Sequence, residues 1–392
     1  MAYTEWNVIE AISPMAVPLP LPVEIVSESA HLDVAVQAMA REQAIALDTE
    51  SNSFHHYPEQ LCLIQIATRH KIYIIDTIVL RDIASLKDVL ADDSTVKVIH
   101  GADYDIRSLD RHCGFRIRNL YDTNIAARFA GMTQVGLAAL IKDLLGVTID
   151  KCKRLQRADW GRRPLSAEAR DYASADVRYL LDLRETLDQR LQAQGRTSWV
   201  AEECARLEDV RYAAPDLETA YLSIKGAWGL DERGLAVLRS LFLFREGEAR
   251  RRHRPPFFVI PDTALMSIAT CPAADLSEVS GIGHNGLQRF GRGLQQAIRD
   301  GLAAPPVHRL PPINAELASQ EQIERLSRLK DWRLSLGTAL SLDPTILWPM
   351  ASLERLARAP DSLEGELASA GIRRWQRHLF TSSLRTYLKS LP

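Results

Sequence analysis

Residues 44–50 read Ala44-Ile45-Ala46-Leu47-Asp48-Thr49-Glu50, four apolar residues that run directly into two carboxylates separated by one threonine. A short apolar run bounded by polar residues predicts a buried β-strand. Residues two apart on a strand point to the same face, so the side chains of Asp48 and Glu50 are expected to lie side by side.

A second pair of polar residues, Tyr172 and Asp176, lies in a segment with helical periodicity that follows Ser166, a plausible N-cap. Residues four apart share one face of a helix. If this helix packs on the strand, three carboxylates come within a few ångströms, and their repulsion is tolerable only with a cation present. Oxygen ligands favour a hard divalent cation.

A third motif, His100-Gly101-Ala102-Asp103-Tyr104-Asp105, lies between the other two. A lone Asp-x-Glu arises often by chance, whereas three motifs in this order and spacing do not. The neighbouring segments 61–66 (LCLIQI), 159–160 (DW) and 163–165 (RPL) extend the pattern. Over nearly its whole length the chain resembles ribonuclease D, a family of exonucleases with four acidic residues and a tyrosine.

The resemblance implies a ribonuclease-H-like α/β exonuclease fold with a mixed central sheet. It implies a 3′-to-5′ exoribonuclease that acts on RNA with a single-stranded 3′ end, releases nucleoside 5′-monophosphates, and processes the 3′ ends of tRNA or other stable RNA. Two Mg²⁺ ions, for which Mn²⁺ substitutes, are the implied cofactors. Their implied ligands are Asp48, Glu50 and Asp176 for one ion, and Asp48 with Asp105 acting through water for the other. Tyr172 is implied to orient the attacking water.

Five further residues are weaker candidates for substrate binding: Gln65, His100, Lys153, Gly281 and Gly283. Gln65 either lines the substrate cleft or is a backbone-bonded core amide. His100 ends a predicted strand, and Lys153 lies in a crowded basic segment. The two glycines open a predicted helix, where backbone N–H groups bind a phosphate or simply cap the helix.

The first half of the chain alternates strands and helices, which is typical of an α/β domain. Short connections predict three antiparallel neighbours, followed by a parallel strand reached through a helix. The expected strands cover residues 43–49, 61–67, 72–75 and 96–99, and the expected helices cover residues 105–112, 122–130, 136–144 and 166–190.

From about residue 212 the pattern becomes helical, and residues 238–298 repeat in residues 326–388. The first copy resembles the helicase-and-ribonuclease-D C-terminal (HRDC) domain, and the second is a divergent relative. Both are expected to be all-α helical bundles. The predicted domains are the exonuclease domain 1–211, the first HRDC domain 212–302, a proline-rich linker 303–312 and the second HRDC-like domain 313–392.

Composition agrees with a protein of several domains, because 392 residues can bury more than one core. Residues 1–22 are apolar but have no basic start and never reach the length of a membrane span, so a cytoplasmic protein without membrane contact is expected. Five scattered cysteines without a C-x-x-C pair argue against disulfides and structural zinc. No obligate protein partner is evident.

Charge divides the chain. Through residue 210 there are 24 basic and 31 acidic residues, and beyond it 24 basic and 19 acidic residues, so the helical half is expected to attract RNA phosphates. Two basic clusters each allow two interpretations. Arg250–Arg254 either contact phosphates or complement the dipole of a helix C-terminus. The arginines beside Trp375 either form an RNA-binding patch with it or are the solvated face of a core aromatic residue. A DNA exonuclease, an inactive nucleic-acid-binding scaffold, and protein docking by the helical repeats remain alternatives.

Overall fold

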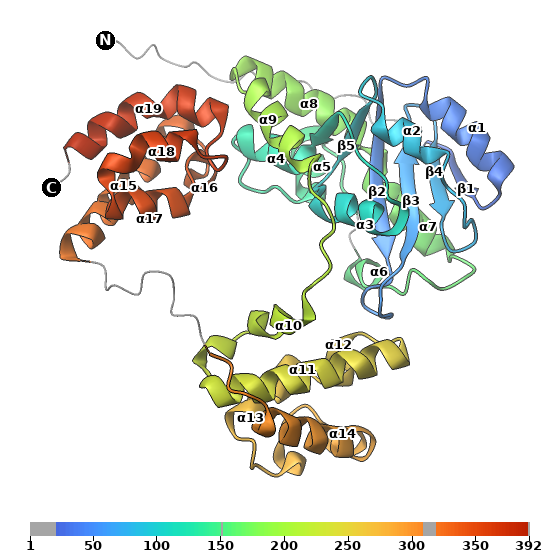
Figure 1. Cartoon of the computed structure of the whole chain (residues 1–392). Coiled ribbons are helices and arrows are strands. Elements are labelled where there is room, and N and C mark those ends of the chain that lie inside the picture. The colour runs from blue at the N-terminus through green and yellow to red at the C-terminus, as the bar shows by residue number, and fades with distance from the viewer. Residues whose placement is uncertain (1–20, 150–151, 309–318, 391–392) are drawn as a thin grey trace.

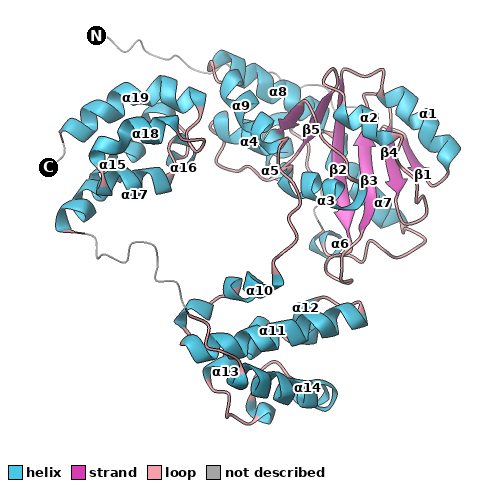
Figure 2. Ribbon diagram, viewed as in Figure 1, coloured by secondary structure: helices cyan, strands magenta, loops and turns pink. Residues whose placement is uncertain are grey.

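The computed structural model describes residues 21–149, 152–308 and 319–390 (Figures 1 and 2). One six-stranded sheet, with strand order β1-β4-β3-β2-β5-β6, forms the centre of the N-terminal part. The strands are β1 (Val23–Val26), β2 (Ala44–Ser51), β3 (Leu61–Ala67), β4 (Ile72–Asp76), β5 (Val96–Ile99) and β6 (Leu120–Asp122).

The sheet is mixed, as predicted. β2, β3 and β4 are antiparallel neighbours, and β5 runs parallel to β2. Two short strands were not predicted: β1 pairs in parallel with β4, and β6 pairs in parallel with β5. They extend both edges of the sheet, while every residue of β3 and β4 is buried at its centre.

Nine helices are described in this part, and they cover both faces of the sheet. They are α1 (Ser29–Met39), α2 (Leu86–Ala91), α3 (Asp103–Cys113), α4 (Thr123–Phe129), α5 (Leu137–Leu145), α6 (Lys153–Gln156), α7 (Ala167–Arg178), α8 (Leu180–Ala193) and α9 (Thr197–Leu207). Ser166 caps α7 by accepting a hydrogen bond from the Ala169 backbone N–H, as predicted.

The helix predicted over residues 166–190 is in fact two helices, because Tyr179 leaves the helical backbone conformation at φ −108° and ψ 1°. The break lets α7 pack across β2, β3 and β4, while α8 packs against α4 and α5. It therefore positions the face of α7 that carries Tyr172 and Asp176 over the centre of the sheet.

The first helical unit (residues 212–308) has its own hydrophobic core, to which residues from Tyr221 to Ile298 contribute. Its elements are α10 (Leu217–Ala220), two 3₁₀ turns at Tyr221–Ser223 and Ala227–Gly229, α11 (Glu232–Arg252), α12 (Pro256–Val259), α13 (Asp262–Thr270), a 3₁₀ turn at Leu276–Glu278, and α14 (Gly283–Ala303).

The second helical unit (residues 319–390) repeats this order. Its helices α15, α16 and α17 have 21, 4 and 9 residues, the same lengths as α11, α12 and α13. The elements are α15 (Gln320–Leu340), α16 (Pro344–Leu347), α17 (Met350–Arg358), a 3₁₀ turn at Pro360–Ser362, α18 (Leu363–Ala368) and α19 (Arg374–Lys389).

Unlike the first unit, the second shares one continuous hydrophobic core with the sheet domain. Trp375 of α19 is only 5% exposed and stacks on Trp199 of α9, with ring centroids 4.8 Å apart and planes inclined by 13°. The ring of Phe129 meets Trp375 edge-on at 5.4 Å. Trp375 is thus an interior residue, so stacking of an RNA base on it is excluded.

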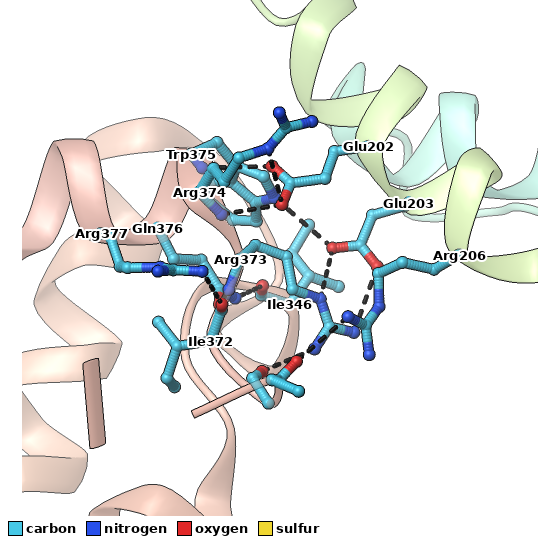
Figure 3. Close-up of polar contacts among 12 residues, drawn as sticks. Glu202, Glu203, Arg206, Ile346, Ile372, Arg373, Arg374, Trp375, Gln376 and Arg377 are labelled. Atoms are coloured by element: carbon cyan, nitrogen blue, oxygen red, sulfur yellow. Dashed lines mark hydrogen bonds and ion pairs between the residues drawn. The ribbon is translucent and has the colours of Figure 1, made fainter. Parts of the chain in front are cut away.

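Polar contacts lie around Trp375 at the start of α19 (Figure 3). Glu202 accepts hydrogen bonds from the backbone N–H groups of Arg374 and Trp375 at the start of α19, at 2.8 and 3.2 Å. Arg373 pairs with Glu203 at 2.8 Å. An acidic side chain at a helix N-terminus satisfies unpaired N–H groups and complements the helix dipole. Two arginines of the predicted basic patch therefore belong to a domain interface: Arg374 through its backbone N–H and Arg373 through its guanidinium.

The remaining sequence predictions concern thiols and membranes. All five cysteines are free thiols, as expected from their spacing. No helix within the described ranges is long and apolar enough to cross a membrane. Residues 1–20 and the last four residues of the predicted linker, 309–312, lie outside the described residues.

Candidate active site

Three carboxylates from two elements meet at one end of the sheet. Asp48 and Glu50 come from β2 and Asp176 from α7, and one ligand oxygen of each lies within 4.8 Å of the others. Among the described residues this is the group of His, Cys, Asp and Glu side chains close enough to hold a metal ion. Strand and helix converge because α7 packs on the face of β2 that carries these residues. Three carboxylates suit a hard divalent cation.

Tyr172 lies one helical turn before Asp176 on α7 and is 9% exposed. Burial, followed by the negative charges of Asp176, Glu50 and Asp48, raises the pKa of its hydroxyl above the ordinary value. The Trp160 ring lies 5.9 Å from the Tyr172 ring and packs against it. Tyr172 therefore stays protonated, and its hydroxyl is available as a hydrogen-bond donor beside the carboxylates.

Asp105 is placed differently from the other three carboxylates. It lies in the first turn of α3, is 5% exposed, and accepts a hydrogen bond of 2.5 Å from the Thr49 hydroxyl. Burial raises its pKa to about 7, and the Thr49 hydrogen bond opposes that shift. Thr49 lies between Asp48 and Glu50 on β2, so its side chain points to the opposite face of the strand. Through its bond to Thr49, α3 approaches β2 beside the three-carboxylate group. Asp105 is not a member of that group.

Gln65 of β3 lies directly opposite Asp48 in the antiparallel ladder. Its side chain is fully buried, and neither its amide oxygen nor its amide nitrogen has a hydrogen-bond partner. The sequence allowed a residue lining the cleft or a backbone-bonded core amide. The structure shows a third situation, an enclosed amide without a backbone partner.

The other predicted substrate-binding residues have local structural explanations. His100 Nδ1 lies 2.9 Å from the Thr123 hydroxyl at the start of α4. Lys153 is exposed on α6. Gly281 has φ +92°, and a Cβ there would lie 2.7 Å from Pro261 Cγ. Gly283 has φ +62°. Backbone conformation alone accounts for both glycines, and the structure does not bring them together with the carboxylates.

The loop between β2 and β3 makes a contact that the sequence did not reveal. The Tyr57 hydroxyl donates a hydrogen bond to Glu246 of α11, and the Arg250 guanidinium lies over the Tyr57 ring at 5.4 Å. Burial, and then Glu246, raises the pKa of Tyr57 to about 12. This loop follows Glu50 directly, so it joins the first helical unit to the neighbourhood of the carboxylates.

Comparison with known proteins gives the same division of the chain. The profile of the 3′-5′ exonuclease family matches residues 23–192, and that of the HRDC domain matches residues 234–298. Ribonuclease D of Granulibacter bethesdensis is 32% identical over 364 residues, which cover 91% of this chain and 90% of the relative. Ribonuclease D of Desulfotalea psychrophila is 31% identical and covers 85% and 90%.

Solved structures extend the similarity to the fold. The crystal structure of Escherichia coli RNase D, described as an exoribonuclease involved in structured RNA processing, has a TM-score of 0.73 and 26% identity and covers 95% of this chain and all of that one. The catalytic core of RRP6 from Trypanosoma brucei has a TM-score of 0.64 and 28% identity and covers 76% and 84%. With both architecture and full-length sequence shared, the chain belongs to the ribonuclease D family of 3′-to-5′ exoribonucleases.

Proposed function

We propose that this enzyme removes nucleotides one at a time from the single-stranded 3′ ends of RNA and releases nucleoside 5′-monophosphates. The observation that carries the proposal is the meeting of Asp48, Glu50 and Asp176 within 4.8 Å in a chain of this family. Phosphodiester hydrolysis brings a nucleophile to an anion, so the site must supply positive charge and a deprotonated water.

We propose that the site binds a pair of Mg²⁺ ions, with Mn²⁺ as a substitute, and the group of Asp48, Glu50 and Asp176 supports the first of these ions. Such ions lower the pKa of the attacking water and stabilise the leaving 3′ oxygen. Asp48, Glu50 and Asp176 would hold one ion, and Asp48 together with Asp105, through water, would hold the other. Tyr172, protonated beside them, would orient the water by donating a hydrogen bond from its hydroxyl, and it would not act as the base.

We further propose that upstream RNA crosses the first helical unit where α11 ends and α12 begins. Phe257 and Phe258 are 50% and 59% exposed, and their ring centroids are 4.7 Å apart. Arg250 and Arg254 precede them in the sequence and are exposed. Aromatic faces stack on unpaired bases and arginines bind phosphates. The same end of α11 contacts the Tyr57 loop, which leads to the carboxylates.

Replacing both phenylalanines by alanine is expected to weaken RNA binding by at least about tenfold, because stacking contributes about 1–3 kcal/mol per base. Fluorescence anisotropy of a labelled single-stranded RNA, measured in chelator to prevent cleavage, checks this. Leu302→Ala removes an exposed apolar side chain from the same unit and serves as the control. Equal affinities of the double variant and the control would place the RNA elsewhere.

The reaction itself is tested with a 5′-labelled single-stranded RNA and a matched DNA, each incubated with the intact protein in Mg²⁺ or in chelator. The expected result is a ladder of RNA products that shortens from the 3′ end in Mg²⁺ only, with nucleoside 5′-monophosphates released. Binding of both polymers without cleavage of either would identify an inactive binding protein instead.

The cellular setting is also part of the proposal. Processing of tRNA or other stable RNA 3′ ends is supported by the structured-RNA role of the E. coli relative. The cytoplasm is supported by five free thiols, which suit a reducing compartment. The proposed domains remain 1–211, 212–302 and 313–392, joined by the linker 303–312, and the separate core of the first helical unit supports the first of these boundaries.

A further inference from the structure

Gln65 is an unusual residue for the centre of a sheet. Its side chain has no exposed surface, yet neither of its polar atoms has a hydrogen-bond partner. Buried polar side chains are bonded in the large majority of cases, because an unpaired amide inside a protein is costly. Because an apolar residue of similar size would avoid this cost, the amide of Gln65 is expected to have a function that such a residue cannot supply.

The position of Gln65 indicates that function. In the ladder it is opposite Asp48 of β2 and Ile74 of β4. Directly opposed residues of antiparallel strands project from the same face, with Cβ atoms about 4.5–5.5 Å apart. The amide therefore emerges beside the Asp48 carboxylate.

Its neighbours along β3 and across the β3–β4 ladder are apolar. Leu63, two residues before Gln65 on the same face, and Ile74 belong to one buried cluster with Tyr172 and Ala173 of α7. None of the Leu63, Ile74 and Ala173 side chains can accept or donate a hydrogen bond. The Asp48 carboxylate is thus the polar group that faces Gln65 across the ladder.

We propose that Gln65 is a positioning residue: when the metal ions bind, its amide N–H, which has no partner in the structure described above, donates to the Asp48 carboxylate and fixes its orientation toward them. The proposal rests on the metal-binding role of Asp48 proposed above. A carboxylate that binds a cation through one oxygen retains acceptor capacity on the other, and hydrogen bonds to metal ligands tune metal affinity. An amide provides the donor without adding a charge, whereas glutamate would add a fourth negative group and lysine would compete with the cation.

Gln65→Met tests this, since methionine is similar in length and cannot make the hydrogen bond. We expect the variant to bind Mn²⁺ about tenfold more weakly by titration calorimetry without RNA. Its melting temperature in chelator should equal or exceed that of the unmodified protein, because an unpaired buried amide is removed. Half-maximal cleavage should require about tenfold more Mg²⁺.

Leu63→Met is the matched control, because it alters packing on the same face and strand without removing a polar group. If Gln65→Met does not fold, Gln65→Leu repeats the test with a branched apolar side chain. Mn²⁺ affinity of the Gln65 variant equal to that of Leu63→Met would overturn the proposal. Because Mn²⁺ binding is measured without substrate, this result stays separate from any failure of RNA cleavage.

Discussion

Asp48→Asn is expected to lower the rate of RNA cleavage by about a thousandfold or more. Asp48 is the carboxylate proposed to contact both metal ions, and replacing it by a neutral amide removes charge where positive ions must be held. Metal ions contribute several kcal/mol to transition-state stabilisation in such sites, and about 4 kcal/mol corresponds to a thousandfold rate change. The measurement is single-turnover cleavage of labelled RNA at saturating enzyme.

Asp171→Asn provides the control for this prediction. It makes the same chemical change on α7, next to Tyr172, but at an exposed position. Its cleavage rate should stay within about twofold of the unmodified enzyme, since surface substitutions away from a site have small effects. Asp48→Asn should retain RNA affinity in chelator, because the proposed RNA-binding surface is on another unit. Substantial Mg²⁺-dependent cleavage by Asp48→Asn would refute the assignment of this residue.

Trp375→Ala is expected to destabilise the sheet domain and the second helical unit together by about 3–5 kcal/mol, the usual cost of deleting a buried tryptophan side chain. The ring stacks on Trp199 and contacts Phe129, so its removal leaves a cavity in the core shared by both parts. Calorimetry should show the corresponding thermal transition at a lower temperature, while the transition of the first helical unit, which has its own core, remains unchanged.

Trp228→Ala controls for the loss of a tryptophan as such. Trp228 belongs to the first helical unit and is 62% exposed, so its replacement should change stability by no more than about 0.5 kcal/mol. If Trp375→Ala leaves both transitions in place, the second helical unit does not depend on the sheet domain in solution. A truncation after residue 211 is a poor test of RNA binding, because it removes Trp375 as well and so uncovers the rings of Phe129 and Trp199.

Strong local patterns made the centre of the fold predictable. β3 and β4 are predominantly apolar runs, and the cap at Ser166 marks the start of α7. β1 and β6 were missed because strands of four and three residues carry too short a pattern and depend on neighbours for their pairing. The break at Tyr179 contains neither glycine nor proline, so only the different packing of α7 and α8 explains it.

The candidate site was predictable where the spacing of residues along a strand or helix determines which way their side chains point. Period two on β2 and period four on α7 point Asp48, Glu50 and Asp176 toward one another. No such period relates Asp105 to them, because its position depends on how α3 packs against Thr49. The isolation of Gln65 was likewise beyond sequence, and the sequence left open whether Trp375 lies in a core or beside RNA, since both outcomes depend on contacts between residues distant in the chain.

The shared core of the sheet domain and the second helical unit has a consequence for the first unit, which lies between them in sequence. Chain segments tether it to one folded body at both ends, at about residue 210 and again at residue 319. Tethering turns each encounter with the active-site loop or with a bound RNA into an intramolecular event at an effective concentration on the order of millimolar. We expect weak contacts such as that of Tyr57 with Glu246 to be sufficient to keep the unit beside the loop that leads to the carboxylates. We therefore expect the tether to favour recapture of RNA released after one cleavage over its diffusion away from the protein.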